Sequence, residues 1–332
     1  MLVIRISIML TEMTTVYRKS IALFTFVDSK APTYLSTQDG KTAEQLAKLC
    51  HVSVDRFHRL LNYMQSLGVL LEKDDKFYLT EQCSSLSDPN SLETLHIKFE
   101  LNPICWSSWT KYNASLNEEN DKSSFEIHYH EKFFDYLGHE QNKVLKNTFD
   151  NLMSKVTNIM NEDIIKHIPL HNISSVIDVG GGKGALAKEI KKNHPNINCA
   201  VMDQYDFSQQ ESEGITFING NFFSAIPAGY DAYCMKNVLH NWPDEKVVDI
   251  LKNCYQAMHK DSTLYIIDMI KERNNAEAES FDLYMDVLLL GKERYQSEFE
   301  ALAKQTGFTI TNMYKMSISK TGAPPHVIEI RK

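Results

Sequence analysis

The stretch VIDVGGGKGALA, Val176–Ala187, changes character twice within a few residues. Its β-branched apolar beginning predicts a strand, its consecutive glycines a tight turn, and the residues after Gly184 the start of a helix. Glycine allows a sharp turn and a close approach of a ligand to the main chain. A helix N-terminus adds free N–H groups and a partial positive charge, and Asp178 adds a carboxylate at the strand end. The stretch therefore predicts a site for a nucleotide, or for a cationic metabolite that carries one.

The glycine turn alone does not define the ligand. Gly180, Gly182 and Ala185 also satisfy the loose dinucleotide-binding pattern, which keeps an NAD(P)-dependent oxidoreductase as an alternative. The turn is not a phosphate-binding P-loop, because Lys183 is followed by glycine and no glycine stands at the required spacing before it. A turn that merely packs a helix on a sheet is the structural alternative.

Length and composition restrict the class of protein. A chain of 332 residues suggests two domains, and a net charge of −8 argues against a nucleic-acid partner. The six cysteines form no CxxC pair, which indicates reduced thiols in a cytoplasmic protein. No Asp, Glu and His residues gather at metal-ligand spacing, so we expect no metal.

The N-terminal segment Met1–Leu10 is apolar but too short to span a bilayer, and no small-residue cleavage site follows it. We therefore expect neither a signal peptide nor a membrane partner. A packed strand and a tail that reaches a partner subunit both remain open, as does a natural start at Met9 or Met13.

The first hundred residues predict a mainly helical module. Thr42 is a candidate N-cap for a short helix, a second helix follows over Asp55–Leu67, and Gly68 ends it. The segments Val69–Glu72 and Lys76–Thr80 then read as a hairpin. This order predicts a winged helix. Because its wing is acidic, we favour a dimerisation scaffold over a DNA-binding, metabolite-sensing regulator.

A stretch of linker helices is expected next, over residues 99–172. Trp106 and Trp109 are spaced to face one way on a helix, where they would line an aromatic substrate or pack under the domain junction. Phe133–Leu137 is an aromatic cluster. Glu140–His167 predicts a long amphipathic helix with Val144 in its apolar stripe.

From Ile173 onward, short apolar strands alternate with helices. This alternation predicts an α/β fold with a Rossmann-like doubly wound sheet, and the last two strands, Phe308–Tyr314 and His326–Ile330, predict an antiparallel edge hairpin. Before this hairpin we expect strands and helices over 174–179, 185–193, 198–202, 216–219, 231–236, 245–258, 262–268, 281–290 and 296–306. The predicted domains are a winged-helix dimerisation domain, 1–98, and a ligand-binding α/β domain, 99–332.

Polar side chains follow several of the predicted strands. Asp203, with Gln204 after it, ends the second strand, where an acid would accept the two hydroxyls of a ribose. After the third strand, Phe222 could lie against an adenine face and Asn221 could bond its edge. His240 follows the fourth strand, near the same mouth of the sheet.

Four segments together resemble one family. They are the glycine stretch, GNFF (Gly220–Phe223), LHNWPDE (Leu239–Glu245) and GKERYQSEFEALAKQTGF (Gly291–Phe308). The family is that of the S-adenosylmethionine-dependent O-methyltransferases that act on small hydroxylated aromatics, including the plant caffeic-acid and flavonoid enzymes, hydroxyindole O-methyltransferase and bacterial polyketide-tailoring enzymes of secondary metabolism. The resemblance covers residues 40 to 330 and implies a homodimer with a small aromatic substrate.

The resemblance also implies roles for single residues. It makes His240 the general base, flanked by Asp268 and Glu293. It assigns the S-adenosylmethionine site to Asp178, Gly180, Gly182, Asp203, Gln204, Asn221, Phe222 and Lys236. Two positions depart from the family pattern: Asn221 replaces an aspartate, and Asn241 stands where aspartate often follows the histidine.

General chemistry is consistent with this role for His240. A phenol has a pKa of ~10 and an imidazole one of ~6.5, so neighbouring carboxylates that favour the charged imidazole help proton removal. Structural alternatives remain: Asp268 as a cap or solvated acid, Glu293 as a partner of Arg294 or of a lysine. Met285 and Leu289 would line the substrate pocket or fill the core.

Overall fold

The computed structural model describes residues 9–117, 119, 121–207, 214–317 and 325–332. These residues form two compact units. One comprises the chain up to Trp106 together with Asn147–Leu152, and the other comprises Ser107–Lys146 and Met153–Lys332. Each unit is described by itself.

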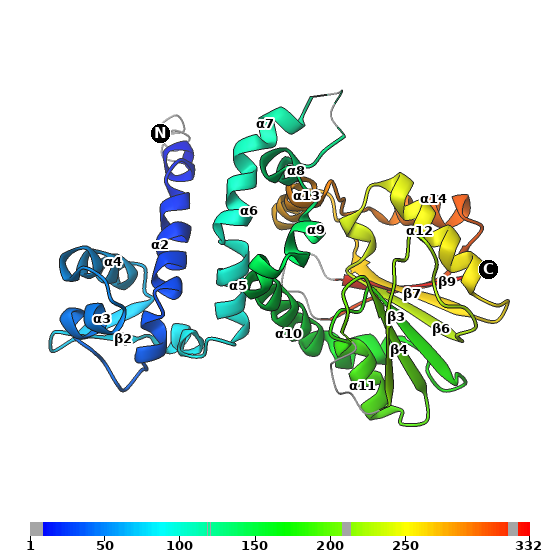
Figure 1. Ribbon diagram of the computed structural model, residues 1–332, viewed down its shortest axis with the longest axis horizontal. Helices are drawn as coiled ribbons and strands as arrows, with labels where there is room; N and C mark the ends of the chain where they lie inside the picture. Colours follow the sequence, from blue (N-terminus) through cyan, green and yellow to red (C-terminus); the bar gives the residue numbers. More distant parts are fainter. Residues whose placement is uncertain (1–8, 118, 120, 208–213, 318–324) are drawn as a thin grey trace. The chain divides into compact units, whose positions relative to one another are not determined.

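The first unit is mainly helical, and its local sequence explains its elements. Thr42 and Gln45 form a reciprocal capping box at the start of α3. Gly68, at φ +77°, follows the end of α4, and Asp74 and Asp75 turn the hairpin with φ of +51° and +58°. The elements are α2 (Val16–Asp28), η1 (Ala31–Tyr34), α3 (Ala43–Leu49), α4 (Val54–Ser66), β1 (Leu70–Lys73), β2 (Lys76–Leu79), η2 (Glu81–Ser87) and α5 (Leu92–Glu100). The helix–turn–helix–hairpin order expected from the sequence is therefore present (Figure 1).

The N-terminal prediction falls mostly outside the described residues. Residues 1–8 are not described, and residues 9–13 are helical. In the part of the chain that the structure covers, no helix combines the length and the apolar character needed to cross a bilayer.

The second unit begins with short helices that lead into a long one. They are η3 (Trp109–Lys111), α7 (Tyr112–Ser115), α8 (Ser124–Tyr129), α9 (Phe133–Gly138), η4 (Glu140–Asn142) and α10 (Lys143–His167); α6 (Pro103–Ser108) spans the division between the units. The expected long helix exists, but Val144 is 80% exposed. Its assignment to the apolar stripe was wrong, because it lies in the first turn and faces solvent.

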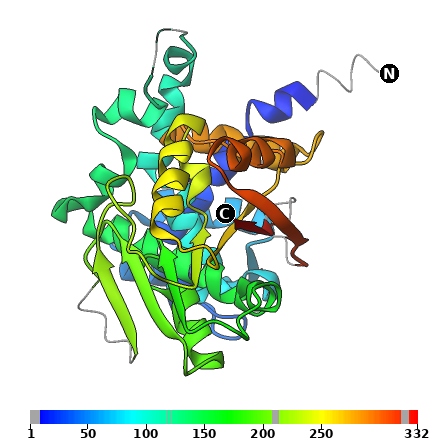
Figure 2. The ribbon, with the colours of Figure 1, turned by 90° about the vertical axis from the view of Figure 1, so that its right-hand side faces the viewer.

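A seven-stranded mixed sheet is the centre of the second unit. Its order is β5-β4-β3-β6-β7-β9-β8; the five strands up to β7 are parallel, and β9 and β8 are antiparallel. The strands are β3 (Ser175–Val179), β4 (Asn198–Asp203), β5 (Ile215–Asn219), β6 (Ala232–Lys236), β7 (Thr263–Met269), β8 (Thr309–Lys315) and β9 (Pro325–Arg331). In Figure 2 the red strands β8 and β9 lie at one edge and the green strands at the opposite edge.

Helices cover both faces of the sheet. One buried cluster joins alternate strand residues such as Ile177 and Val179 to α12 (Asp244–Ala257) and α14 (Gln296–Gln305). A second joins Val176 and Val201 to α10 and α11 (Ala185–Asn193). Figure 1 shows α11 on one side and α12 and α14 on the other. Burial on both faces explains why the central strands β3, β6 and β7 are mainly apolar, as parallel strands commonly are.

The helix that precedes α14 is longer than expected. α13 runs over Ala276–Leu289, whereas the sequence indicated a start at Phe281. The side chain of Asn275 accepts hydrogen bonds from the N–H groups of Glu277 and Ala278, both at 3.1 Å, and so caps an earlier turn. The first turns are acidic and poor in large apolar residues, so the hydrophobic period begins after the helix does.

Candidate active site at the carboxyl ends of the strands

Gly180 and Gly182 have different surroundings in the glycine turn. Gly180 has φ +74°, and a Cβ there would lie 2.8 Å from Val238, on the turn after β6. Its N–H donates to the carbonyl of Met202 at 2.7 Å. Gly182 has φ +54°, and its Cβ position has open space around it. The turn is therefore pressed against its neighbour at Gly180 and open at Gly182, where a ligand can approach the backbone.

Asp178 is placed differently from the expectation. The sequence indicated a carboxylate at the open mouth, but Asp178 is only 2% exposed and lies beneath the turn, where a Cβ on Gly181 would be 2.5 Å from its Oδ2. Burial raises its pKa to about 7, and the cation of Lys236 opposes this shift. Asp178 thus supports the turn from below, because the missing side chain at Gly181 leaves room for it.

Asp203 ends β4 beside the glycine turn. Its Oδ2 accepts the N–H of Gly182 at 2.9 Å, and its Oδ1 accepts the N–H of Tyr205 at 3.0 Å. A carboxylate has about four acceptor positions, and these two bonds orient it beside the glycine turn. Gln204 is exposed beyond it, and its carbonyl accepts from Asn219 at 2.9 Å.

The loop after β5 brings an aromatic ring to the turn. Phe222 approaches the Cβ position of Gly180 to 3.8 Å, and its ring lies 6.1 Å from that of Trp242. Asn221 is exposed, and its Oδ1 accepts the N–H of Phe223 at 2.9 Å. This local turn uses the amide oxygen of Asn221.

Lys236 ends β6 between two acids. Burial lowers its pKa to about 8, while Asp178 and Asp268 pull the pKa back upward. Lys236 is therefore mainly cationic at neutral pH. It links the acid beneath the glycine turn electrostatically to the acid at the end of β7.

His240 lies in the short helical turn Leu239–Asn241, after β6, with both predicted acids beside it. Its Nδ1 is 2.6 Å from Oε1 of Glu293 and 4.0 Å from Oδ1 of Asp268. Both acids are 0% exposed and His240 is 8% exposed. The structure thus brings the three predicted catalytic residues together on one face of the imidazole. The suggested pairing of Glu293 with Arg294 or a lysine is wrong, since its side chain contacts His240.

The charges around this imidazole favour its protonated form. Burial alone would lower the pKa of His240, but the carboxylates of Glu293 and Asp268 outweigh it and raise the pKa, against a small opposing effect of Lys236. Burial also raises the pKa of Asp268 to about 6, although His240 opposes this shift. Among the described residues, neither oxygen of Asp268 has a hydrogen-bond partner. Its effect on the imidazole is therefore purely electrostatic.

Arg294 holds the turn that carries His240. Its guanidinium is 1% exposed and donates to the carbonyls of Leu239 at 3.0 Å and Trp242 at 2.7 Å, on either side of the histidine. Its Nε donates to Asp244 at 2.9 Å. The N–H of Lys292 also donates to the carbonyl of His240 at 2.8 Å. The backbone around His240 is thus fixed from the segment that carries Glu293.

Replacing Arg294 by methionine is expected to lower the free energy of unfolding by about 2 kcal/mol, because buried carbonyl groups lose charged donors. Urea denaturation followed by circular dichroism measures this. Lys192→Met is the matched control: Lys192 is 74% exposed on α11 and makes only a local pair with Glu189, so its replacement should cost less than 0.5 kcal/mol. Equal costs for both variants would contradict the structural role of Arg294.

The predicted substrate residues are not gathered as closely as the catalytic ones. Trp106 and Trp109 are 41% and 40% exposed and belong to different units. On α13, Met285 is 6% exposed and Leu289 is half-buried. An aromatic side chain that the sequence did not single out, Phe281, lies 6.1 Å from the His240 ring.

Several supporting residues escaped the sequence-based prediction. Asp282 accepts the N–H of Glu293 at 2.7 Å, and Val238 packs on Gly180. Asp282 carried a weak signal, as one of two acids, with Asp286, in the mainly apolar stretch 281–290. Val238 carried none, because its role depends on which loop lies opposite the glycine turn.

Comparison with known proteins identifies the family. The model of the O-methyltransferase domain matches residues 109–309, which is more than half of the chain. The chain belongs to the O-methyltransferase family. The enzyme is 29% identical, over 95% of its length and 91% of the relative's, to a mitomycin biosynthesis 6-O-methyltransferase of Streptomyces lavendulae. It depends on S-adenosylmethionine, as the members of this family do.

Two solved structures extend the likeness of the methyltransferase to its whole chain. The mitomycin 7-O-methyltransferase MmcR superimposes with a TM-score of 0.90 and 26% identity, over 99% of this chain and 98% of that one. An O-methyltransferase from neocarzinostatin biosynthesis, solved with S-adenosylmethionine and 2-hydroxy-5-methyl naphthoic acid, shares the fold with a TM-score of 0.78 and 22% identity over 94% and 95% of the two chains. Methyl transfer is therefore selected over the nicotinamide-dependent and regulatory alternatives.

The residues at the strand ends fit this cofactor. The open space at Gly182 allows a close approach, and the Asp203 carboxylate lies beside it. The ring of Phe222 lies next to the same turn. A nucleoside needs these three features: access to the backbone, an acid for the ribose and a flat apolar surface for the base.

Proposed function

We propose that the enzyme transfers a methyl group from S-adenosylmethionine to a hydroxyl group of a small aromatic natural product, with His240 as general base. The 2.6 Å contact between Nδ1 of His240 and Glu293 carries this proposal. It occupies one ring nitrogen with a buried carboxylate and leaves the other for a substrate. The turn that holds His240 also packs on the glycine turn through Val238.

The two acids set the protonation of the imidazole. Glu293 accepts a hydrogen bond from the protonated Nδ1, so the neutral ring presents the lone pair of Nε2 to the substrate. A substrate hydroxyl then gives its proton to Nε2 as its oxygen becomes nucleophilic. The imidazolium that results is stabilised by Glu293 and by Asp268, whose carboxylate is 4.0 Å from Nδ1.

The bound cofactor supplies an electrophilic methyl group on a sulfonium centre. We propose that the following residues hold it: Gly180, Gly182, Asp203, Gln204, Asn221, Phe222 and Lys236, with Asp178 as the support of the glycine turn. Asp203 would bind the ribose hydroxyls. The exposed Asn221 and the ring of Phe222 would contact the adenine.

An aromatic substrate fits the surroundings of the base. The ring of Phe281 lies 6.1 Å from His240 and 6.2 Å from the ring of Tyr284. The related neocarzinostatin enzyme was solved with a naphthoic acid. We propose that Trp109, with Met285 and Leu289 of α13, completes the apolar surroundings of the substrate.

We further propose a cytoplasmic homodimer in which the first 98 residues form a winged-helix dimerisation domain. All six cysteines lie in described segments, and none of them forms a disulfide there. Large apolar side chains at the beginning of the described chain are exposed, among them Met13 at 65% and Tyr17 at 61%. A second copy of the chain would remove this surface from water.

The acid limb of the pH–rate profile should report His240. Only neutral imidazole accepts a proton, so kcat/KM should rise with pH through an apparent pKa above ~6.5, the ordinary value of histidine. Glu293→Gln removes the largest influence that raises this pKa, so the limb should move to lower pH. Initial rates from pH 5 to 9 measure it, with Asp249→Asn on the exposed face of α12 as control. An unmoved limb would contradict the assigned pair.

The proposed reaction is tested with methyl-labelled S-adenosylmethionine and a panel of phenols, catechols and quinone-type polyketides. Transfer to an aromatic hydroxyl is expected, and mass spectrometry locates the new methyl group. Transfer only to amines or thiols, with none to any hydroxyl in the panel, would reject the proposal. His240→Asn serves as the inactive control, because it keeps a donor for Glu293 but has no basic nitrogen.

A further inference from the structure

The position of the Glu293 carboxylate is not set by a helix or a strand. Glu293 lies between α13 and α14, next to a single parallel bridge between Ile270 and Arg294. Contacts with other parts of the chain must therefore hold it 2.6 Å from His240. Its side chain is fully buried, so a displaced carboxylate would lose its contact with His240 without reaching water.

Asp282, on α13, binds the backbone of Glu293. Its Oδ1 accepts the N–H of Glu293 at 2.7 Å, and its Oδ2 accepts Nζ of Lys271 at 2.6 Å. The two oxygens are thus used by two different partners. A carboxylate held at both oxygens cannot rotate without breaking one charge-assisted hydrogen bond.

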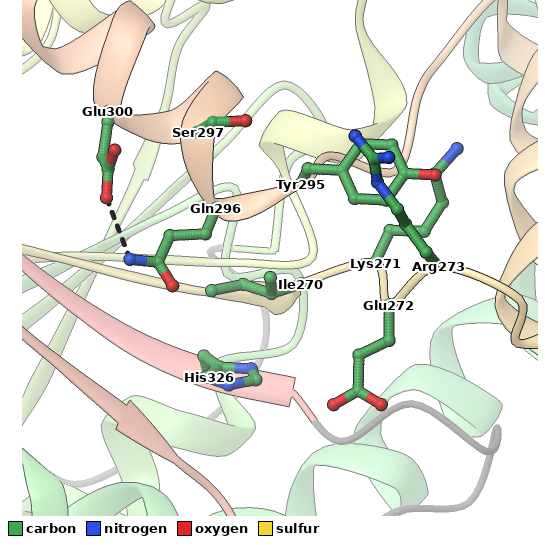
Figure 3. Close-up of a pocket in the computed structure, with 9 residues that line it drawn as sticks. All are labelled: Ile270, Lys271, Glu272, Arg273, Tyr295, Gln296, Ser297, Glu300 and His326. Atoms are coloured by element: carbon green, nitrogen blue, oxygen red, sulfur yellow. Dashed lines mark hydrogen bonds between the residues drawn. The ribbon is translucent and has the colours of Figure 1, made fainter.

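Lys271 anchors Asp282 from the end of β7. Its side chain is 9% exposed and also lies 3.3 Å from Glu279. Burial would lower its pKa, but its bonds to Asp282 and Glu279 outweigh this and raise the pKa, so it stays cationic. Its backbone N–H donates to the carbonyl of Arg294 at 2.8 Å. Figure 3 shows Lys271 with Arg273 beside the ring of Tyr295 on the wall of a pocket.

These contacts join the two acids of the site. Asp268 lies in β7, and Lys271 lies three residues later, just beyond the bridge that Ile270 forms with Arg294. Asp268 faces His240, and Lys271 holds Asp282. Asp282 in turn holds Glu293. Other titratable neighbours of Asp282 are Asp286 and Tyr112, and those of His240 are Glu293, Asp268 and Lys236.

We propose that Asp282 is a positioning residue for methyl transfer: it fixes Glu293 against His240, and Lys271 fixes Asp282 in the required orientation. This inference rests on the proposed base. Substitution of Asp282 should therefore lower the rate of methyl transfer strongly, although Asp282 does not touch the reacting atoms. A displacement of ~1 Å in a catalytic contact can cost 10²-fold in rate.

Asp282→Ala is expected to lower kcat about 30-fold, to leave the KM for S-adenosylmethionine within twofold, and to move the acid limb of kcat/KM to lower pH, as Glu293→Gln does. A residue that merely stabilises the fold would scale down the rate without moving the limb. Asp249→Ala, at an exposed acid of α12 that pairs loosely with Lys246 at 3.9 Å, is the matched control and should behave like the wild type.

A double-mutant cycle tests whether Asp282 acts through Glu293. In the Glu293→Gln background, Asp282→Ala should cost less than threefold, because the contact that it positions is already impaired. If Asp282→Ala does not fold, Asp282→Asn and Lys271→Met take its place, with smaller shifts in the same direction. Additive losses, or an unmoved limb in a folded variant, would overturn the inference. If Glu293→Gln itself leaves the limb unmoved, the proposed base is wrong instead.

Discussion

His240→Ala is expected to lower kcat by about 10³-fold, while the Kd for S-adenosylmethionine changes less than twofold. The variant removes the only nitrogen assigned to accept the substrate proton, but none of the groups assigned to the cofactor. Methyl transfer from labelled cofactor at saturating substrate measures kcat, and calorimetry measures the Kd. The loss should be equal in kcat and kcat/KM if His240 acts only in the transition state.

The alanine variant also leaves the buried carboxylate of Glu293 without its 2.6 Å partner. His240→Asn is the control for this effect, because its amide nitrogen can donate to Glu293. We expect the asparagine variant to be as inactive as the alanine variant but more stable. Turnover near the wild-type level in either variant would remove His240 as the base, whatever the cofactor affinity.

Asp203→Ala is expected to raise the Kd for S-adenosylmethionine by about 10²-fold. The hydrogen bonds proposed between this carboxylate and the ribose hydroxyls would be lost, and a hydrogen bond to a charged group has a net worth of about 1.5–3 kcal/mol. The N–H of Gly182 also loses its acceptor at 2.9 Å, so the glycine turn becomes less ordered. Calorimetric titration with the cofactor, or with S-adenosylhomocysteine, measures the change.

Asp203→Asn separates the two contributions, because it keeps an acceptor for Gly182 but binds hydroxyls less strongly. It should weaken binding less than alanine does. Asp261→Ala, at an exposed acid before β7, should leave the Kd unchanged. If Asp203→Ala binds the cofactor as tightly as the wild type, the ribose is held elsewhere, and the strand-end assignment fails.

Much of the α/β unit could be predicted because its signals are local. The helix over Ala185–Asn193 has the predicted bounds, and most strands differ from the prediction by one or two residues. Two of the catalytic candidates could be predicted as neighbours because carboxyl ends of parallel strands meet at one edge. Asp268 at the end of β7 and His240 after β6 follow this rule.

The strand-end rule could not place Glu293 beside His240, because Glu293 follows a helix and the contact spans more than fifty positions. Only the family resemblance indicated that the two residues are neighbours. Asp282 shows the same limit: its carboxylate meets Glu293 only because α13 packs beside the extension of β7. The burial of Asp178 likewise depends on the missing side chain of Gly181 directly above it.

The amino-acid sequence by itself determined the strand–turn–helix at Gly180–Gly182, the alternation that builds the sheet, and the residue types at the strand ends, because each depends on backbone preferences and hydrophobic period over a few neighbouring residues. Only the tertiary structure decided which acid touches the imidazole, which lysine and arginine hold the surrounding backbone, and how far each group is removed from water. These are properties of packed surfaces: hydrogen-bond partners and pKa shifts arise when distant segments exclude solvent together.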